Sequence, residues 1–426
     1  MSMYPDHNNI KQGQLTALKE IIDVTNASNP FWQKRFSACG IDNDIDSLEA
    51  YFEKMSFCDK NDFVADQSAI KPYGTNLSFP IENFTRISQT SGTTGHTIRW
   101  LDTHADWEWM VRGWRKIFES AGITHIDTVI FPFSFSPFIG FWLAFEAAVS
   151  LQCLTIPAAN VSSSLRLKMI VENEVTCICC TPTYAIRLGQ VAQEAGINIS
   201  DTNLRVMILA GEPGGSIPQT RAMISALWSG VNIVDHHGMT EVGPVSYQCP
   251  SQWGKLHLME SSYITEVIDF KTNLPVGYGE TGELVITTLG RFGSPVFRYK
   301  TGDMVKLANS TCECGSCEMT LDGGILGRTD DMVIIRGVNL YPSGVESVVR
   351  QCSEINEYQV KISNNNGMPE VMIEIETLPI IDHADLVATH LAEKLKERFS
   401  LRIAVKIVPS DSLPRYELKS KRWLRV

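Results

Sequence analysis

The stretch LGRTDDMVIIRGVN, from Leu326 to Asn339, divides the 426-residue chain into two unequal parts. It opens with polar and glycine residues and runs into a short apolar strand at Met332 to Ile335. Turn-forming residues between regular elements are typical of a boundary. We therefore expect an N-terminal domain of residues 1–326 and a C-terminal domain of residues 327–426.

The segment after this boundary predicts a small α+β domain. Apolar residues recur there first at strand spacing and then at helical spacing. We expect a loop at 339–343, a helix at 344–352, strands at 359–362 and 371–375, and a long helix at 385–399.

Upstream of the boundary, short apolar runs alternate with amphipathic segments, which is typical of βαβ units around a parallel sheet. Strands are expected at 128–131, 151–156, 177–180, 206–210 and 232–235, with helices at 163–173 and 218–227. The first ~80 residues predict helices, and a β-rich portion with strands at 263–270 and 282–288 follows residue 260. The predicted fold class is α/β: a large N-terminal domain of βαβ units with mixed sheets plus this β-rich portion, and a small, mobile C-terminal domain.

Composition narrows the functional class. The chain is 44% hydrophobic and 20% charged, which is ordinary for a globular protein, and its net charge of −11 argues against a broad nucleic-acid surface. No apolar window reaches the ~18 residues of a membrane span. The N-terminus has no signal-peptide pattern, so we expect a cytoplasmic protein whose eleven cysteines form no disulfides.

A loop rich in glycine and hydroxyl side chains is the first candidate binding site. Its residues are Thr90, Ser91, Gly92, Thr93, Thr94 and Gly95. Glycine lets the backbone curl so that N–H groups converge on phosphate oxygens, and hydroxyls add donors. The lysine of a Walker A sequence is missing. Taken alone, the segment is either a phosphate loop or a flexible turn.

Three further segments are candidate ligand sites. Asp235 to Pro244 and Leu209 to Pro213 each follow a predicted strand, and ligands of α/β sheets bind where strands end. In the first, Thr240 and Glu241 offer a hydroxyl and a carboxylate, which suit Mg²⁺. Asp303 has the acceptors for two hydroxyl groups. Each segment is also compatible with an ordinary turn.

In this order, the motifs resemble those of the adenylate-forming superfamily, which includes acyl-CoA ligases, luciferases and peptide-synthetase adenylation domains. The stretch from Leu326 to Glu346 is specifically similar to the phenylacetate–CoA ligase branch. The resemblance covers the chain from about Asn29 onward. It implies an AMP-forming acid–thiol ligase that uses ATP and Mg²⁺ to make an acyl-adenylate and then a thioester, with coenzyme A as the acceptor.

The resemblance also implies a role for each matching residue. Residues 90–95 hold phosphate, Thr240 contacts phosphate, Glu241 ligates Mg²⁺, and Asp303 and Arg328 bind the ribose. Asp330 is the hinge, Arg336 and Gly337 face the thiol tunnel, and Lys419 is the adenylation lysine, with Lys421 as the alternative. The nucleotide pocket is completed by Gly211, Glu212, Pro213, Asp235, His236, His237, Gly238 and Met239.

The sequence departs from the family pattern at two positions. His96 stands where the phosphate loop usually has lysine, and Leu418 stands where glycine usually precedes the catalytic lysine. Two alternatives therefore stay open: transfer of the acyl group to a carrier-protein thiol or an amine, and a catalytically inactive, nucleotide-binding regulator. A homodimer is compatible with the sequence, which does not decide the oligomeric state.

Three cysteines within six residues, Cys312, Cys314 and Cys317, indicate a metal site. A structural Zn²⁺ needs four ligands, and Cys249 or His257 could supply the fourth. The resemblance implies the set Cys249, His257, Cys312 and Cys314, with Cys317 as substitute. Free buried thiols and a redox role are the alternatives. Cys177, Cys179 and Cys180 lie in an apolar strand and are expected to be buried.

The acid is the least determined part of the prediction. A cluster of aromatic residues lies between the phosphate loop and the predicted adenine loop, and aromatic walls suit a flat ring or an alkyl chain. Its candidate pocket residues are Phe133, Phe135, Phe138 and Phe141, with Tyr184 further along the chain. We expect an aromatic acid, with ordinary core packing as the alternative reading of the cluster.

Overall fold

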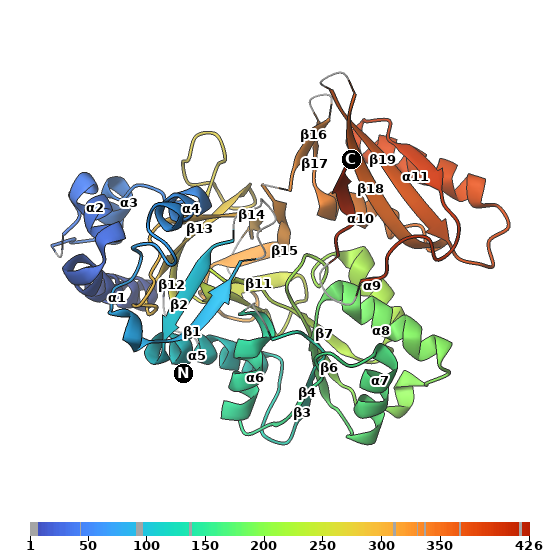
Figure 1. Cartoon of the computed structure of the whole chain (residues 1–426), viewed down its shortest axis with the longest axis horizontal. Helices are drawn as coiled ribbons and strands as arrows, with labels where there is room; N and C mark the ends of the chain where they lie inside the picture. The colour runs from blue at the N-terminus through green and yellow to red at the C-terminus, as the bar shows by residue number, and fades with distance from the viewer. Residues whose placement is uncertain are drawn as a thin grey trace.

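The structure is a computed structural model. It describes residues 7–42, 44–90, 97–135, 139–309, 312–329, 331–335, 338–365, 368–416 and 420–426. Within these ranges it is a mixed α/β protein, as predicted, with one parallel sheet, one large antiparallel sheet and a separate group of C-terminal elements (Figure 1).

Helices form the N-terminal region, as the apolar spacing predicts. They are α1 (His7–Ser28), α2 (Pro30–Cys39), α3 (Leu48–Lys54) and α4 (Lys60–Ala69). Asn29 caps α2 by accepting from the N–H of Trp32, and Pro30 occupies its first turn, where no N–H is needed. Gly40 ends the helix with φ of 61°, a left-handed conformation that glycine adopts without strain.

The predicted βαβ region forms a five-stranded parallel sheet in the order β4-β3-β5-β6-β7. The strands are β3 (Thr128–Phe131), β4 (Leu154–Pro157), β5 (Cys177–Cys180), β6 (Val206–Leu209) and β7 (Asn232–Asp235). Its helices are α6 (Gly140–Ser150), α7 (Ser163–Glu172), α8 (Pro182–Glu194) and α9 (Pro218–Leu227), with the short turn η2 (Ile199–Asp201). Parallel pairing brings all the carboxyl ends to one edge, so Leu209 and Asp235 end there as register partners.

The β-rich portion is a six-stranded antiparallel sheet in the order β10-β11-β15-β14-β13-β12. Its strands are β10 (Ser246–Gln248), β11 (Lys255–Leu258), β12 (Tyr263–Ile268), β13 (Thr281–Thr288), β14 (Tyr299–Leu307) and β15 (Thr320–Arg328). Nearby lie η1 (Ile81–Asn83), α5 (His104–Ser120) and the antiparallel pairs of β1 (Phe84–Gln89) with β2 (Arg99–Thr103) and of β8 (Gly238–Met239) with β9 (Gly243–Pro244).

The C-terminal elements gather at one end of the molecule, next to α8 and α9 (Figure 1). They are the hairpin of β16 (Val333–Ile335) and β17 (Val338–Leu340), the helices α10 (Pro342–Val349) and α11 (Ala384–Phe399), and a sheet in the order β20-β19-β18-β21. That sheet contains β18 (Ile355–Asn365), β19 (Met368–Thr377), β20 (Ala404–Ile407) and β21 (Trp423–Arg425). These elements enclose their own hydrophobic cluster, from Val333 to Trp423.

Two sequence predictions in this region need correction. The expected loop at 339–343 begins inside β17, because Val333 and Leu340 are register partners in the hairpin. The expected helix at 344–352 starts earlier and ends earlier, since Pro342 supplies its first turn. None of the described helices is both long and apolar enough to span a membrane.

Candidate functional site

Asp303 lies at the centre of the candidate nucleotide site and is 3% exposed. Its Oδ2 lies 2.9 Å from His237 Nε2, and its Oδ1 accepts from Arg328 Nη1 at 2.9 Å. Arg328 comes within reach because it is the register partner of Asp303 across β14 and β15. Burial alone would raise the pKa of Asp303, but His237 and Arg328 together lower it below its usual value. The carboxylate is therefore held ionised, with acceptor oxygens ready for hydroxyl groups.

The segment after β7 carries the predicted phosphate and Mg²⁺ residues. Thr240 is half-buried, whereas Glu241 is 7% exposed and burial raises its pKa. A divalent cation beside a buried carboxylate would supply the missing positive charge, and oxygen ligands are the ones Mg²⁺ prefers. The donor chemistry of Glu241 thus fits a magnesium ion, which this carboxylate would hold.

Arg291 fixes the backbone of this segment, a role that sequence reasoning missed. Its side chain is fully buried, and its Nη1 donates to the carbonyls of Thr240 at 3.0 Å and Glu241 at 2.6 Å. Its Nε donates to Asp102 Oδ1 at 2.7 Å. The ion pair anchors the turn that presents the hydroxyl and the carboxylate. No local motif marks it, since the two charges lie 189 residues apart in the sequence.

Asp235 is held at the end of β7, close to the predicted adenine loop. Its Oδ2 accepts from Ser216 Oγ at 2.5 Å, and its backbone N–H donates to Gln248 Oε1 at 3.1 Å. Gly215 and Gly324 pack so closely that an added Cβ would lie 2.6 Å and 3.2 Å from the carboxyl group. The small residues that crowd this carboxyl keep water away from it, and burial raises its pKa to about 6.

This burial makes a pH dependence measurable. The folded-state pKa of Asp235 is about 6 against an ordinary value of 3.8, so the folded state binds more protons between these values. Stability from this group is therefore present below pH ~4 and is lost as pH rises through ~6, by about 3 kcal/mol in all. We expect Asp235→Asn to remove this fall. Urea unfolding of both proteins from pH 4 to 8 measures it. A stability difference that stays constant with pH would contradict the prediction.

The adenine-loop residue Glu212 contacts the end of the chain. Gly211 and Pro213 are exposed beside it, while Glu212 Oε1 accepts from the Thr183 N–H at 2.8 Å. Its Oε2 accepts from the Ser420 N–H at 2.9 Å and from the Ser420 hydroxyl at 3.2 Å. The C-terminal tail is thereby brought to the loop expected to hold the base.

Several predicted site residues lie outside the described ranges. In the phosphate loop only Thr90 is described, and it pairs with Ile98 through its N–H at 3.0 Å and its hydroxyl at 3.1 Å. The others are Ser91, Gly92, Thr93, Thr94, Gly95, His96, Phe138, Asp330, Arg336, Gly337, Leu418 and Lys419.

The predicted zinc ligands converge. The ligand atoms of Cys249, His257, Cys312 and Cys314 all lie within 4.8 Å of one another. Cys249 Sγ lies 3.4 Å from Cys312 Sγ, and Cys314 Sγ lies 3.3 Å from His257 Nε2. These separations fit ligands around one tetrahedral Zn²⁺. Thr320 Oγ1 lies 3.0 Å from His257 Nδ1, which orients the ring with Nε2 toward the thiols.

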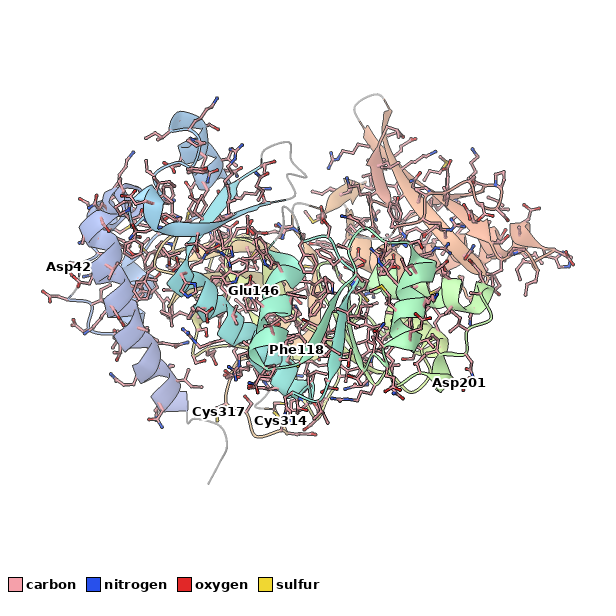
Figure 2. The ribbon with its side chains drawn as sticks, turned by 60° about the horizontal axis from the view of Figure 1, so that its bottom comes forward. Asp42, Phe118, Glu146, Asp201, Cys314 and Cys317 are labelled. Carbon is pink, nitrogen blue, oxygen red and sulfur yellow. The ribbon has the colours of Figure 1, made fainter. Side chains whose placement is uncertain are left out.

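The cluster is formed by the residue after β10, by β11 and by the segment between β14 and β15. Cys314 and Cys317 lie at the edge of the molecule opposite the C-terminal elements (Figure 2). Cys317, the substitute in the sequence prediction, is not part of the converging set. Cys177, Cys179 and Cys180 are buried in β5, as expected.

The predicted acyl-pocket residues divide into two groups. Phe133 and Phe141 pack edge to face with their centroids 5.0 Å apart, and Phe135 packs on Phe145 in the same hydrophobic cluster. Tyr184 lies in a different cluster, where its hydroxyl accepts from Arg166 Nη1 at 2.7 Å. The structure thus places Phe133, Phe135 and Phe141 in one hydrophobic cluster and Tyr184 in another.

Comparisons with known proteins give a consistent result. The model of the AMP-binding enzyme family matches residues 63–292, and that of the AMP-binding enzyme C-terminal domain matches residues 337–424. The phenylacetate–coenzyme A ligase of Pseudomonas putida is 28% identical over 420 residues, covering 96% of this chain and 93% of the relative.

Solved structures of 2-hydroxyisobutyryl-CoA ligase share the fold. The postadenylation state with 2-HIB-AMP is 24% identical with a TM-score of 0.93, covering all of this chain and 91% of that one. The thioesterification state, with the same coverage and 25% identity, gives a TM-score of 0.74. The overall fold of the present structure is thus more similar to the first of these two structures than to the second.

Proposed function

Because the chain belongs to the AMP-binding enzyme family and is an AMP-forming acid–thiol ligase of its phenylacetate–CoA ligase-like branch, we propose that it activates an aromatic acid with ATP and transfers the acyl group to coenzyme A. The observation that carries the proposal is the buried, ionised Asp303 between His237 and Arg328, beside the turn that holds Thr240 and Glu241. In this arrangement Asp303 binds the ribose hydroxyls, and the substrate carboxylate attacks the α-phosphorus as pyrophosphate leaves.

Catalysis of this step depends on positioning and charge neutralisation. Thr240 and residues 90–95 orient the phosphates, and Arg291 keeps the Thr240 and Glu241 backbone in place. Glu241 would hold Mg²⁺, which supplies positive charge against the leaving pyrophosphate. Gly211, Glu212 and Pro213, with Asp235 and residues 237–239, line the base.

The proposed division at residues 1–326 and 327–426, with Asp330 as hinge, accounts for two half-reactions in one site. It is supported by the separate hydrophobic cluster of the C-terminal elements. Ser420 donates to Glu212, so the residue next to Lys419 lies at the base loop. Turning about the hinge would withdraw Lys419 and bring Arg336 and Gly337 to the thiol tunnel.

The decisive experiment measures pyrophosphate release with ATP and Mg²⁺ across aryl, arylacetic, alkyl and amino acids, with and without coenzyme A. We expect release with one aromatic class and a thioester only with coenzyme A. Release without a thioester would move the acceptor to a carrier-protein thiol or an amine. No release with any acid would favour an inactive, nucleotide-binding regulator.

Lys419→Ala separates an enzyme from such a regulator. We expect adenylation to fall at least ~100-fold, since a positioned cation on developing charge contributes that much. Lys421→Ala is the matched control and should retain most activity, because Lys421 is exposed. The measurement is the rate of acid-dependent pyrophosphate release by the two variants and the wild type. A larger loss in Lys421→Ala would move the catalytic assignment by two residues, and two unaffected variants would contradict it.

We propose that Cys249, His257, Cys312 and Cys314 bind one structural Zn²⁺. The purified protein is expected to contain about one zinc per chain, measured by atomic emission. Cys312→Ser should lose the metal and lower the melting temperature, whereas Cys317→Ser should keep both. A wild-type zinc content well below one would instead support free buried thiols. Equal metal loss in both variants would show that Cys317 is a ligand and would contradict the proposed set.

A further inference from the structure

His236 is a buried side chain that the proposed mechanism does not use. It is 6% exposed, and neither ring nitrogen has a hydrogen-bond partner in the part of the chain that the structure describes. Buried polar groups are almost always hydrogen-bonded, and leaving one unpaired destabilises the folded protein. An unpaired polar side chain beside a candidate binding site indicates that a polar group of the bound ligand is its hydrogen-bond partner.

His236 and His237 have different neighbours. Both residues lie between the end of β7 and the start of β8. His237 faces the ribose carboxylate of Asp303. His236 instead packs edge to face on Trp114 of α5, with their centroids 4.3 Å apart.

Trp114 connects His236 to the predicted acyl pocket. Its ring centroid lies 5.9 Å from that of Phe141, which in turn lies 5.0 Å from that of Phe133. His236 therefore borders the aromatic cluster that contains the predicted pocket residues Phe133 and Phe141. It is the polar member of an otherwise apolar wall formed by these three side chains.

The chemistry of the ring indicates what it can bind. Burial lowers the pKa of His236 to about 3, so the imidazole is neutral near pH 7. A neutral imidazole has one N–H donor and one acceptor nitrogen. A hydroxyl group matches either nitrogen, whereas a second carboxylate could only accept and an ammonium group could only donate. Burying either charge there would also cost far more than burying a hydroxyl.

We propose that His236 is a specificity-determining residue that selects a hydroxylated aryl or arylacetic acid by hydrogen bonding to its hydroxyl group. This inference rests on the proposed ligase function. A site built to hydrogen-bond a hydroxyl discriminates against the analogue that lacks it, because the protein group is then left buried and unpaired.

The test uses matched acids that differ only by the hydroxyl: phenylacetate and benzoate against their 2-, 3- and 4-hydroxy derivatives. The readout is kcat/KM for acid-dependent pyrophosphate release. We expect the wild type to favour one hydroxylated acid by at least ~10-fold over its parent. His236→Leu should reduce that ratio by ~10-fold or more, and His236→Gln, which can still donate and accept, should keep part of it. His125→Leu, at an exposed position, is the matched control and should leave the ratio unchanged.

The outcomes separate this inference from the proposed function. Turnover of aromatic acids with the same hydroxyl ratio in wild type and His236→Leu would overturn the role of His236 and leave the ligase intact. No pyrophosphate release with any acid would overturn both. If His236→Leu does not fold, the hydroxyl ratios of His236→Gln and His236→Asn are measured in its place, and wild-type ratios in both variants would overturn the inference. An active wild type that shows no preference for any hydroxylated acid would also overturn it.

Discussion

Asp303→Asn is expected to lower kcat/KM for adenylation by ~1,000-fold. The substitution removes the negative charge between His237 and Arg328 and replaces one of the two carboxylate oxygens with a donor. Losing one partner of a buried, hydrogen-bonded charge pair costs about 2–5 kcal/mol, and a ~1,000-fold loss corresponds to a free energy within these limits. The measurement is acid-dependent pyrophosphate release at varied ATP.

The control for this variant is Asp322→Asn. Asp322 lies in β15 and pairs with Lys306, but its side chain is 45% exposed. Exposed ion pairs contribute little, so activity should stay near that of the wild type. If Asp303→Asn retained activity within a few-fold of wild type, the carboxylate would not be the ribose ligand.

Arg291→Met is expected to lower the free energy of unfolding by about 3–5 kcal/mol and to abolish adenylation. The variant leaves Asp102 charged and unpaired in the interior, and it leaves the carbonyls of Thr240 and Glu241 without their donor. Chemical denaturation measures the first effect, and pyrophosphate release measures the second.

A double variant separates stability from function. Asp102→Leu with Arg291→Met removes both buried charges, so most of the lost stability should return. Adenylation should not return, because the two carbonyls still lack the guanidinium. Arg115→Met is the surface control, since Arg115 and Glu119 form an exposed helical pair worth less than ~0.5 kcal/mol. Full recovery of activity in the double variant would show that Arg291 acts on stability alone.

The sequence predicted the parallel sheet well because its signal is local. The four-residue apolar runs at 128–131, 177–180 and 232–235 became β3, β5 and β7 with the same limits. The prediction of a loop at 339–343 was wrong because the structure there depends on a non-local contact. The pairing of Val333 with Leu340 in a hairpin depends on a partner strand, which residue preferences within the loop do not encode.

The candidate site divides in the same way. Asp303, His237 and Arg328 lie in motifs and were named from the sequence, and the structure brings them into contact. Arg291 was missed because its partners come from distant segments and nothing near it marks a function. Tyr184 was expected to contribute to the same pocket as the phenylalanines, and in the structure its hydroxyl pairs with Arg166 in another hydrophobic cluster. Tertiary contacts, which no local motif encodes, set the positions of Arg291 and Tyr184.

Glu212 accepts hydrogen bonds from both α8 and the C-terminal tail. Under the proposed function, the Glu212 carboxylate belongs to the loop that binds the base and also binds the C-terminal tail at Ser420. Thermodynamic linkage makes such an arrangement reciprocal. If tail docking orders the loop and tightens nucleotide binding by some factor, bound nucleotide must favour the docked tail by the same factor. Departure of the tail and loosening of the nucleotide would then be two aspects of a single equilibrium.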